Sequence, residues 1–358
     1  MRLNYRRTFF VGLAFMSICA FWQLYNYVVP LMLQYTFHLD EHIIGYVMAA
    51  DNVLALFLLP LFGTLSDKTH TRLGKRTPYI LIGTVLAVVL MLILPQADWN
   101  QHFLVFVIVL GALLLVMSTY RSPAVALMPD VTPKPLRSKA NAVINLMGAL
   151  GGIFTYLIIM VMLPKTDPAT GEKAASYVTV FAIVAGFMLL TAILLPLTVK
   201  ENQLVAAMPP EPEEEGGGKK ALPRPVKKSL LFMLLSVAFW YMAYNAVESA
   251  YSRYVLEEWH VNESVGATMM IVAMLVATVS YIPIGFISSA LGRKKVILGG
   301  VALMGISFAV GTLFHAYTVW AYVVMGLIGV GWAAINVNSY PMVVEMSRGS
   351  DVGKYTGY

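Results

Sequence analysis

The chain carries the stretch Gly63-Thr-Leu-Ser-Asp-Lys68, followed by Thr71-Arg-Leu-Gly-Lys-Arg-Thr-Pro-Tyr79, between two long apolar segments. A shorter version lies nearer the C-terminus, as Gly285-Phe-Ile-Ser-Ser289 followed by Gly292-Arg-Lys-Lys295. In both places a glycine near the end of one apolar segment precedes a basic cluster that leads into the next segment. The same turn in two places indicates that the chain contains a duplicated unit.

The composition predicts that the apolar segments cross a membrane. Hydrophobic residues make up 58% of the chain and charged residues only 12%, whereas soluble domains carry about 25% charged residues. A spanning helix needs roughly 20 mainly apolar residues. We therefore expect an all-α membrane protein. The sequence offers ten candidate spans, approximately 8–35, 43–65, 79–96, 102–128, 138–163, 176–198, 229–256, 264–288, 295–314 and 319–345.

The basic residues predict the orientation. With the N-terminus in the cytoplasm, nearly all turn lysines and arginines fall on the cytoplasmic side, and only Lys165 and Lys173 fall outside. We therefore expect a multi-pass protein of the cell (inner) membrane with a cytoplasmic N-terminus. The net charge of +6 follows from this topology and does not call for a nucleic-acid partner. The single cysteine, Cys19, excludes a disulfide framework, and no metal or cofactor motif is expected.

Residues 199–228 are polar, charged and rich in Pro and Gly, which predicts a flexible cytoplasmic linker. It separates six spans in residues 1–198 from four spans in residues 229–358. A duplicated six-span unit predicts two more spans after Tyr358, so we expect the chain to be a C-terminally truncated fragment. A natural ten-span protein is the alternative.

Short echoes on the two sides of the linker support the duplication. Tyr25-Asn26 corresponds to Tyr244-Asn245, and Phe37-His-Leu-Asp-Glu41 corresponds to Trp259-His-Val-Asn-Glu263. Gly45 lies shortly after the first of these longer stretches, and Gly266 lies shortly after the second.

These features resemble the major facilitator superfamily. Within it, residues 66–80 resemble the sucrose/maltose–proton and the glycoside–pentoside–hexuronide:cation symporters. So do the stretches Tyr120–Pro123, Pro129–Asn141 and Gly331–Ser339. The resemblance implies a bundle of 6+6 helices, about ten of which are present here, with spans one, four, seven and ten around a central cavity.

Four ionisable residues stand out inside predicted spans, where an unpartnered charge costs several kcal/mol. They are Asp51, Arg121, Glu248 and Arg253. Asp51 and Arg121 are expected at different depths, so a direct salt bridge is not assumed. The proton-coupling candidates are Asp51, Glu248 and Arg121. Sucrose–proton transporters carry an acid–base pair in span seven, of which Glu248 and Arg253 are a loose counterpart with different spacing.

Polar residues recur at helical spacing in three spans, which places each set on one helix face. Amides and carboxylates bind sugar hydroxyls, and aromatic faces cover a pyranose ring, so these stripes are candidate cavity linings. Interhelical hydrogen bonding is the alternative. The candidate substrate-binding residues are Gln23, Asn26, Arg121, Tyr244, Asn245, Glu248, Trp332 and Asn336.

The charged turns are interpreted as a cytoplasmic gate, because acids at helix ends can pair with turn arginines. The candidate gate residues are Gly63, Asp67, Arg72, Gly74, Lys75, Arg76, Asp130 and Arg293.

The resulting hypothesis is a monomeric secondary active transporter that carries a glycoside, taken to be a disaccharide, together with protons by alternating access. Its partners are the sugar, protons and the lipid bilayer. Coupling to sodium or another cation is one alternative. It is less favoured because Ala55 and Leu59 occupy the turns after Asp51, where cation symporters typically repeat the aspartate. A transport-inactive sugar receptor is another alternative. An enzyme is not expected, since no carboxylate pair lies on one helix face at catalytic spacing.

Overall fold

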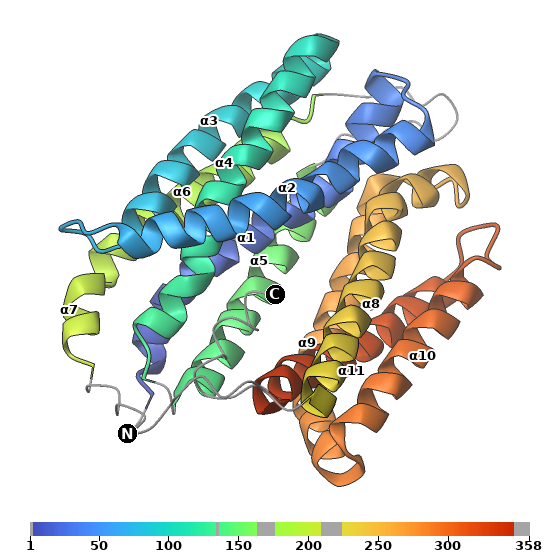
Figure 1. Cartoon of the computed structure of the whole chain (residues 1–358). Coiled ribbons are helices and arrows are strands. Elements are labelled where there is room, and N and C mark those ends of the chain that lie inside the picture. The colour runs from blue at the N-terminus through green and yellow to red at the C-terminus, as the bar shows by residue number, and fades with distance from the viewer. Residues whose placement is uncertain (1–2, 134–135, 163–175, 209–223, 347–358) are drawn as a thin grey trace. The chain divides into compact units, whose positions relative to one another are not determined.

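The computed structural model describes residues 3–133, 136–162, 176–208 and 224–346. The side chains of a few further residues inside the helices are not described. All elements of the described chain are helices (Figure 1). They are α1 (Tyr5–Leu31), the π-helix η1 (Met32–Thr36), α2 (Glu41–Lys68), α3 (Thr77–Trp99), α4 (Phe103–Asp130), α5 (Arg137–Met162), α6 (Val178–Thr198), α7 (Glu201–Ala206), α8 (Arg224–Glu257), α9 (Glu263–Leu291), α10 (Arg293–Gly311) and α11 (Trp320–Met346).

Ten helical stretches in the described residues are long and apolar enough to cross a membrane, as the sequence predicted. Of the described helices, η1 continues the span that begins with α1, and α7, with six residues, is too short to cross a membrane. The all-α membrane fold class is therefore confirmed, and the chain is a multi-pass membrane protein.

The helices form two compact units. The first contains residues 1–209 together with 249–268, and the second contains residues 210–248 together with 269–358. This division differs from the expected boundary at the linker, because the end of α8 and the start of α9 group with the first unit.

Small residues let helices of the first unit approach closely. A Cβ on Gly151 of α5 would lie 2.2 Å from the carbonyl oxygen of Met16 on α1, and one on Gly148 would lie 2.7 Å from the Phe15 ring. On α3, a Cβ on Gly83 would lie 2.7 Å from the Cβ of Tyr120 on α4. Such contacts bring membrane helices together by van der Waals packing.

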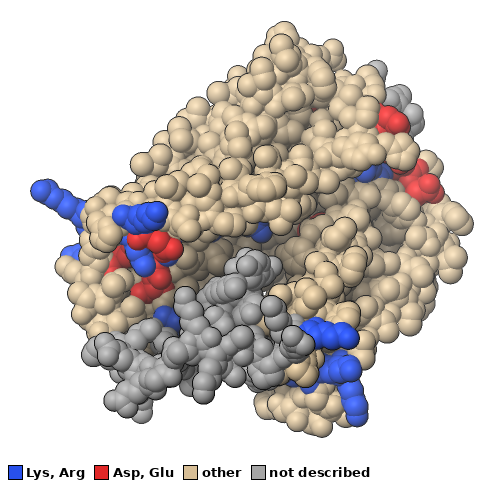
Figure 2. All heavy atoms as spheres, viewed as in Figure 1, with Lys and Arg blue, Asp and Glu red and all other residues tan. Residues whose placement is uncertain are grey.

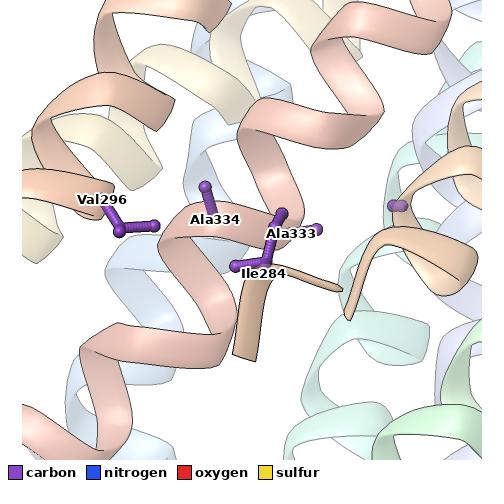
Figure 3. Close-up of a cluster of buried hydrophobic side chains, with 5 residues drawn as sticks. Ile284, Val296, Ala333 and Ala334 are labelled. Carbon is purple, nitrogen blue, oxygen red and sulfur yellow. The ribbon is translucent and has the colours of Figure 1, made fainter. Parts of the chain in front are cut away.

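In the second unit, α9, α10 and α11 share a small apolar core (Figure 3). It is formed by Ala277 and Ile284 of α9, Val296 of α10, and Ala333 and Ala334 of α11. Gly300 and Gly331 bring α10 and α11 together, since a Cβ on Gly300 would lie 2.9 Å from the carbonyl oxygen of Gly331.

The duplicated segments share a backbone conformation. His38 and His260 both adopt the left-handed region, with φ of 50° and 51°. The next residue donates its N–H six residues back in each case, from Leu39 to Leu33 and from Val261 to Val255. Repeated sequence at these positions therefore corresponds to a repeated helix ending.

Part of the segment expected to be a flexible linker is folded. Residues 201–206 form α7, and Glu201 is only 1% exposed. The next described helix, α8, already begins at Arg224. Residues 209–223 of the expected linker, Lys165, Lys173 and the end of the chain at Tyr358 lie outside the described residues.

Candidate functional site

An arginine on α4 lies against an aromatic ring of α1 inside the first unit. The Arg121 guanidinium carbon is 5.2 Å from the centre of the Trp22 ring. Both side chains are half-buried. A guanidinium on an indole face is stabilised by about 0.5–2 kcal/mol, more when it is desolvated. This contact holds the guanidinium in a defined orientation although no ion pair to Arg121 occurs among the described residues.

Asp51 of α2 belongs to the same cluster. Its Oδ1 is buried and has no hydrogen-bond partner in the described chain. Arg121 is near enough to act on the Asp51 carboxyl group electrostatically. The two residues predicted to lie at different depths are therefore coupled, although they do not form a salt bridge.

Tyr25 completes the cluster from α1, one turn after Trp22. The two rings meet edge to face at 5.4 Å, and Asp51 acts electrostatically on Tyr25. Tyr25 Oη and Trp22 Nε1 are buried without a hydrogen-bond partner in the described chain. Together with Asp51 Oδ1, α1 and α2 thus present three buried donor and acceptor atoms near the Arg121 cation of α4. Buried polar atoms are rarely left unpaired, so such a cluster is suited to a hydroxylated ligand.

Two of the predicted substrate-binding residues, Gln23 and Asn26 of α1, behave differently from this cluster. Gln23 Oε1 accepts a hydrogen bond from Tyr156 Oη of α5 at 2.7 Å, and Asn26 is half-buried. For Gln23 the structure favours the alternative of interhelical bonding over a free ligand contact.

The second unit contains an aromatic cluster on α8 and α11. The Tyr244 and Trp332 ring centres are 4.2 Å apart, and Trp240 meets Trp332 edge to face at 5.3 Å. Glu248 acts electrostatically on Tyr244, one turn away. Trp240 Nε1 is buried without a hydrogen-bond partner in this unit's described part. Aromatic faces beside a carboxylate can bind a sugar ring and one of its hydroxyl groups.

The remaining predicted ligands of the second unit are less well placed. Asn245 is half-buried on α8. Asn336 is exposed, and its side-chain amide donates to the carbonyl of Trp332 in its own helix at 3.3 Å. In this conformation the Asn336 amide is therefore already engaged.

The predicted gate residues of the first unit form a network centred on Arg76. Arg76 is 5% exposed and donates through Nε to Asp130 Oδ2 at 2.8 Å. Its other nitrogens donate to Asp67, to Ser66 and to the carbonyl of Gly63. Lys75 pairs with the same Asp130 oxygen at 3.1 Å. The network joins the ends of α2, α3 and α4, and Figure 2 shows the acidic and basic side chains gathered at the turn between α2 and α3.

Glu201 of α7 is a member of this turn that the sequence did not reveal. Its carboxylate accepts from the backbone N–H groups of Lys75, Arg76 and Thr77 at 2.9–3.2 Å, and from Thr77 Oγ1 at 2.7 Å. α3 has no side-chain cap of its own. An anion at a helix N-terminus is favoured by the free N–H groups and the helix dipole. Glu201 therefore supplies the missing cap from a distant part of the chain.

Gly74 makes room for this cap. Its φ of 122° is one that side chains disfavour, and a Cβ there would lie 2.1 Å from Glu201 Oε2. Two predicted gate residues lie outside the network. Arg72 is exposed and contributes its carbonyl to Asn202, and Arg293 begins α10 in the second unit.

No group of three His, Cys, Asp or Glu residues that could hold a metal ion occurs within the described ranges.

Comparisons with known proteins agree with this architecture. A family model described as the Major Facilitator Superfamily matches residues 11–358. Proton-associated sugar transporter A of Homo sapiens is 26% identical over 219 residues, which is 57% of this chain and 28% of that protein. The lactose permease of Lactobacillus helveticus is 25% identical over 171 residues, 44% of this chain and 26% of that protein. The matched stretches thus span less than a third of these relatives.

A solved structure shares the fold. The xylose transporter of E. coli in its inward-open conformation matches with a TM-score of 0.69, at 15% identity, over 99% of this chain and 85% of that one.

Proposed function

Because this chain belongs to the Major Facilitator Superfamily, we propose that it is a secondary active transporter that moves a glycoside together with protons. The proposed substrate class is a disaccharide, since the relatives include a sugar transporter described as proton-associated and a lactose permease. We place the protein in the cell membrane with its N-terminus in the cytoplasm, and we propose that it acts as a monomer. Alternating access by rocking of two repeats is the mechanism that this architecture supports.

One observation carries the proposal. Trp22, Tyr25 and Asp51 present three buried polar atoms that have no hydrogen-bond partner among the described residues, near the Arg121 guanidinium. A sugar hydroxyl both donates and accepts, so a few hydroxyl groups would pair all of these atoms at once. The face of Trp22 offers an apolar surface for the C–H side of a pyranose ring.

Asp51 is the proposed proton carrier. The Arg121 cation stabilises the ionised form of the Asp51 carboxyl group. When Arg121 is engaged elsewhere, the buried carboxyl group is more stable in its protonated form. A sugar that draws Arg121 towards its hydroxyls would therefore favour proton uptake at Asp51, which links the two movements. In this scheme Glu248 of the second unit is a further candidate for the coupling acid.

Replacing Asp51 tests the proposal. In proteoliposomes containing the whole chain, an imposed pH gradient should drive accumulation of labelled lactose, maltose or sucrose by the wild type. Asp51→Asn should abolish accumulation but retain part of the exchange of labelled for unlabelled sugar, because sugar binding does not require the proton carrier. Asp40→Asn is the matched control, since Asp40 is exposed and asparagine caps a helix equally well.

The outcomes separate the alternatives. Concentrative uptake by Asp51→Asn at the wild-type level would remove Asp51 from coupling. Accumulation driven by a sodium gradient and indifferent to pH would identify the cation-coupled alternative. Sugar binding without uptake or exchange would identify a receptor.

A further inference from the structure

A second group of unpartnered polar atoms lies in the first unit, where the π-helix η1 after α1 meets the end of α8. Arg253 is only 9% exposed, yet its Nε and Nη1 are buried without a hydrogen-bond partner in the described chain. Gln34 Oε1, on η1, is a buried acceptor that also lacks a partner there. Unmatched donors and an unmatched acceptor thus occur in one region.

Hydrogen bonds and charge connect these two residues. The Gln34 amide nitrogen donates to Glu257 Oε1, and Tyr35 Oη lies 3.5 Å from the same oxygen. Glu257 is one turn after Arg253 on α8, and Arg253 acts electrostatically on Tyr35. The widened turn of a π-helix carries Gln34 and Tyr35, and single π turns occur frequently at functional sites.

The charges favour a neutral ligand. Glu257 and Glu263 both act electrostatically on Tyr35, so the Arg253 cation is accompanied by two carboxylates. An anion would be repelled by these carboxylates. A ligand with adjacent hydroxyl groups would instead accept from the Arg253 fork and donate to Gln34 Oε1. It would thereby pair buried polar atoms whose unpaired state is unfavourable.

We propose that Arg253, Gln34 and Tyr35 form a second subsite for sugar hydroxyl groups, separate from the cluster around Arg121. The proposal rests on the proposed function, since it takes the same class of neutral polyhydroxy ligand. The subsite would bind the sugar at the C-terminal end of α1, at a position separate from the Arg121 cluster.

Cysteine protection tests the subsite. Thr36 follows Tyr35 in η1 and is half-buried, so Thr36→Cys in a Cys19→Ser background places a single thiol beside the site. In the purified whole chain, saturating lactose, maltose or sucrose should slow labelling of this thiol by N-ethylmaleimide several-fold. Arg253→Gln should abolish the protection, while Arg6→Gln, at an exposed arginine, should retain it.

The central cluster provides the second arm of the test. Protection should persist in an Arg121→Ala background if the subsite binds sugar independently. Protection that disappears with Arg121→Ala would report a conformational change transmitted from the central cluster and would overturn the proposal. Protection by none of the three sugars, or protection unaffected by Arg253→Gln, would overturn it as well.

Two safeguards keep the result interpretable. If Arg253→Gln does not yield folded protein, Gln34→Ala removes the unpaired acceptor and should abolish protection in its place. Failure of the proposed transport function would be seen as absent accumulation in proteoliposomes, which leaves protection of the thiol unaffected and is therefore distinguishable.

Discussion

The position of the Arg121 guanidinium leads to a specific prediction about sugar binding. Its planar guanidinium lies over Trp22 and can hold two acceptors at once, which the compact ammonium of lysine cannot do. Arg121→Lys keeps the charge but loses this fork, so we expect glycoside affinity to fall by more than about tenfold, or about 1.4 kcal/mol. Binding of labelled sugar to the detergent-purified chain measures the change.

The exposed Arg6 provides the control for this substitution. Arg6→Lys should bind the sugar as the wild type does. If Arg121→Lys also binds normally, the arginine only balances the charge of Asp51, and the sugar site must be sought at the second-unit residues Tyr244, Glu248 and Trp332.

The sequence identified single candidate site residues only where a polar or charged side chain lies in an otherwise apolar segment. Asp51 and Arg121 were identified because ionisable groups are costly in an apolar segment. Trp22 and Tyr25 were not identified, since aromatic residues are ordinary in an apolar helix and their unpaired atoms become visible only in three dimensions. The amide of Gln23 was identified, but its pairing with Tyr156 depends on how α1 packs on α5.

At the scale of elements, the two repeated turns differ in one testable way. Gly74 and Gly292 both have positive φ, of 122° and 88°, but only Gly74 is crowded by Glu201. Beyond its neighbours in the chain, no described residue would contact a Cβ on Gly292 within 4 Å. Alanine at either position carries a backbone cost of roughly 1–2 kcal/mol. Gly74→Ala should cost more, because it also displaces the carboxylate that caps α3.

Thermal unfolding in detergent compares the two variants directly. The melting temperature of Gly74→Ala should lie below that of Gly292→Ala, and combining Gly74→Ala with Glu201→Ala should cost less than the sum of the single changes. Equal melting temperatures for the two glycine variants would contradict the capping role of Glu201.

The elements themselves were largely predictable, and the reason is physical. A membrane fixes the length and polarity of each span, so ten apolar segments sufficed to predict ten helices. α7 was missed because its charged sequence borders a segment rich in Pro and Gly. Its folding depends on the N–H groups of α3, which lie far away in the sequence.

At the scale of the whole molecule, the Arg76 network stands apart from the candidate sugar cluster. Asp67 follows Asp51 on the same helix by sixteen residues, which corresponds to about 24 Å at the helical rise. A change in the network can reach the sugar only through movement of helices and not through direct contact. Transport and binding should therefore respond differently to its loss.

Arg76→Ala removes the donor that joins Asp67, Asp130 and the carbonyl of Gly63. The ends of α2, α3 and α4 would lose their common partner, and two carboxylates would lose their shared cation, so interconversion between transport states should slow. We expect the turnover of sugar exchange in proteoliposomes to fall, while the equilibrium affinity changes less than about tenfold, or 1.4 kcal/mol. Lys68→Ala is the matched control, because Lys68 is an exposed basic residue of the same turn. Normal turnover together with a larger loss of affinity in Arg76→Ala would show that the network contributes to the binding site itself, and the assignment of these residues to a gate would then be wrong.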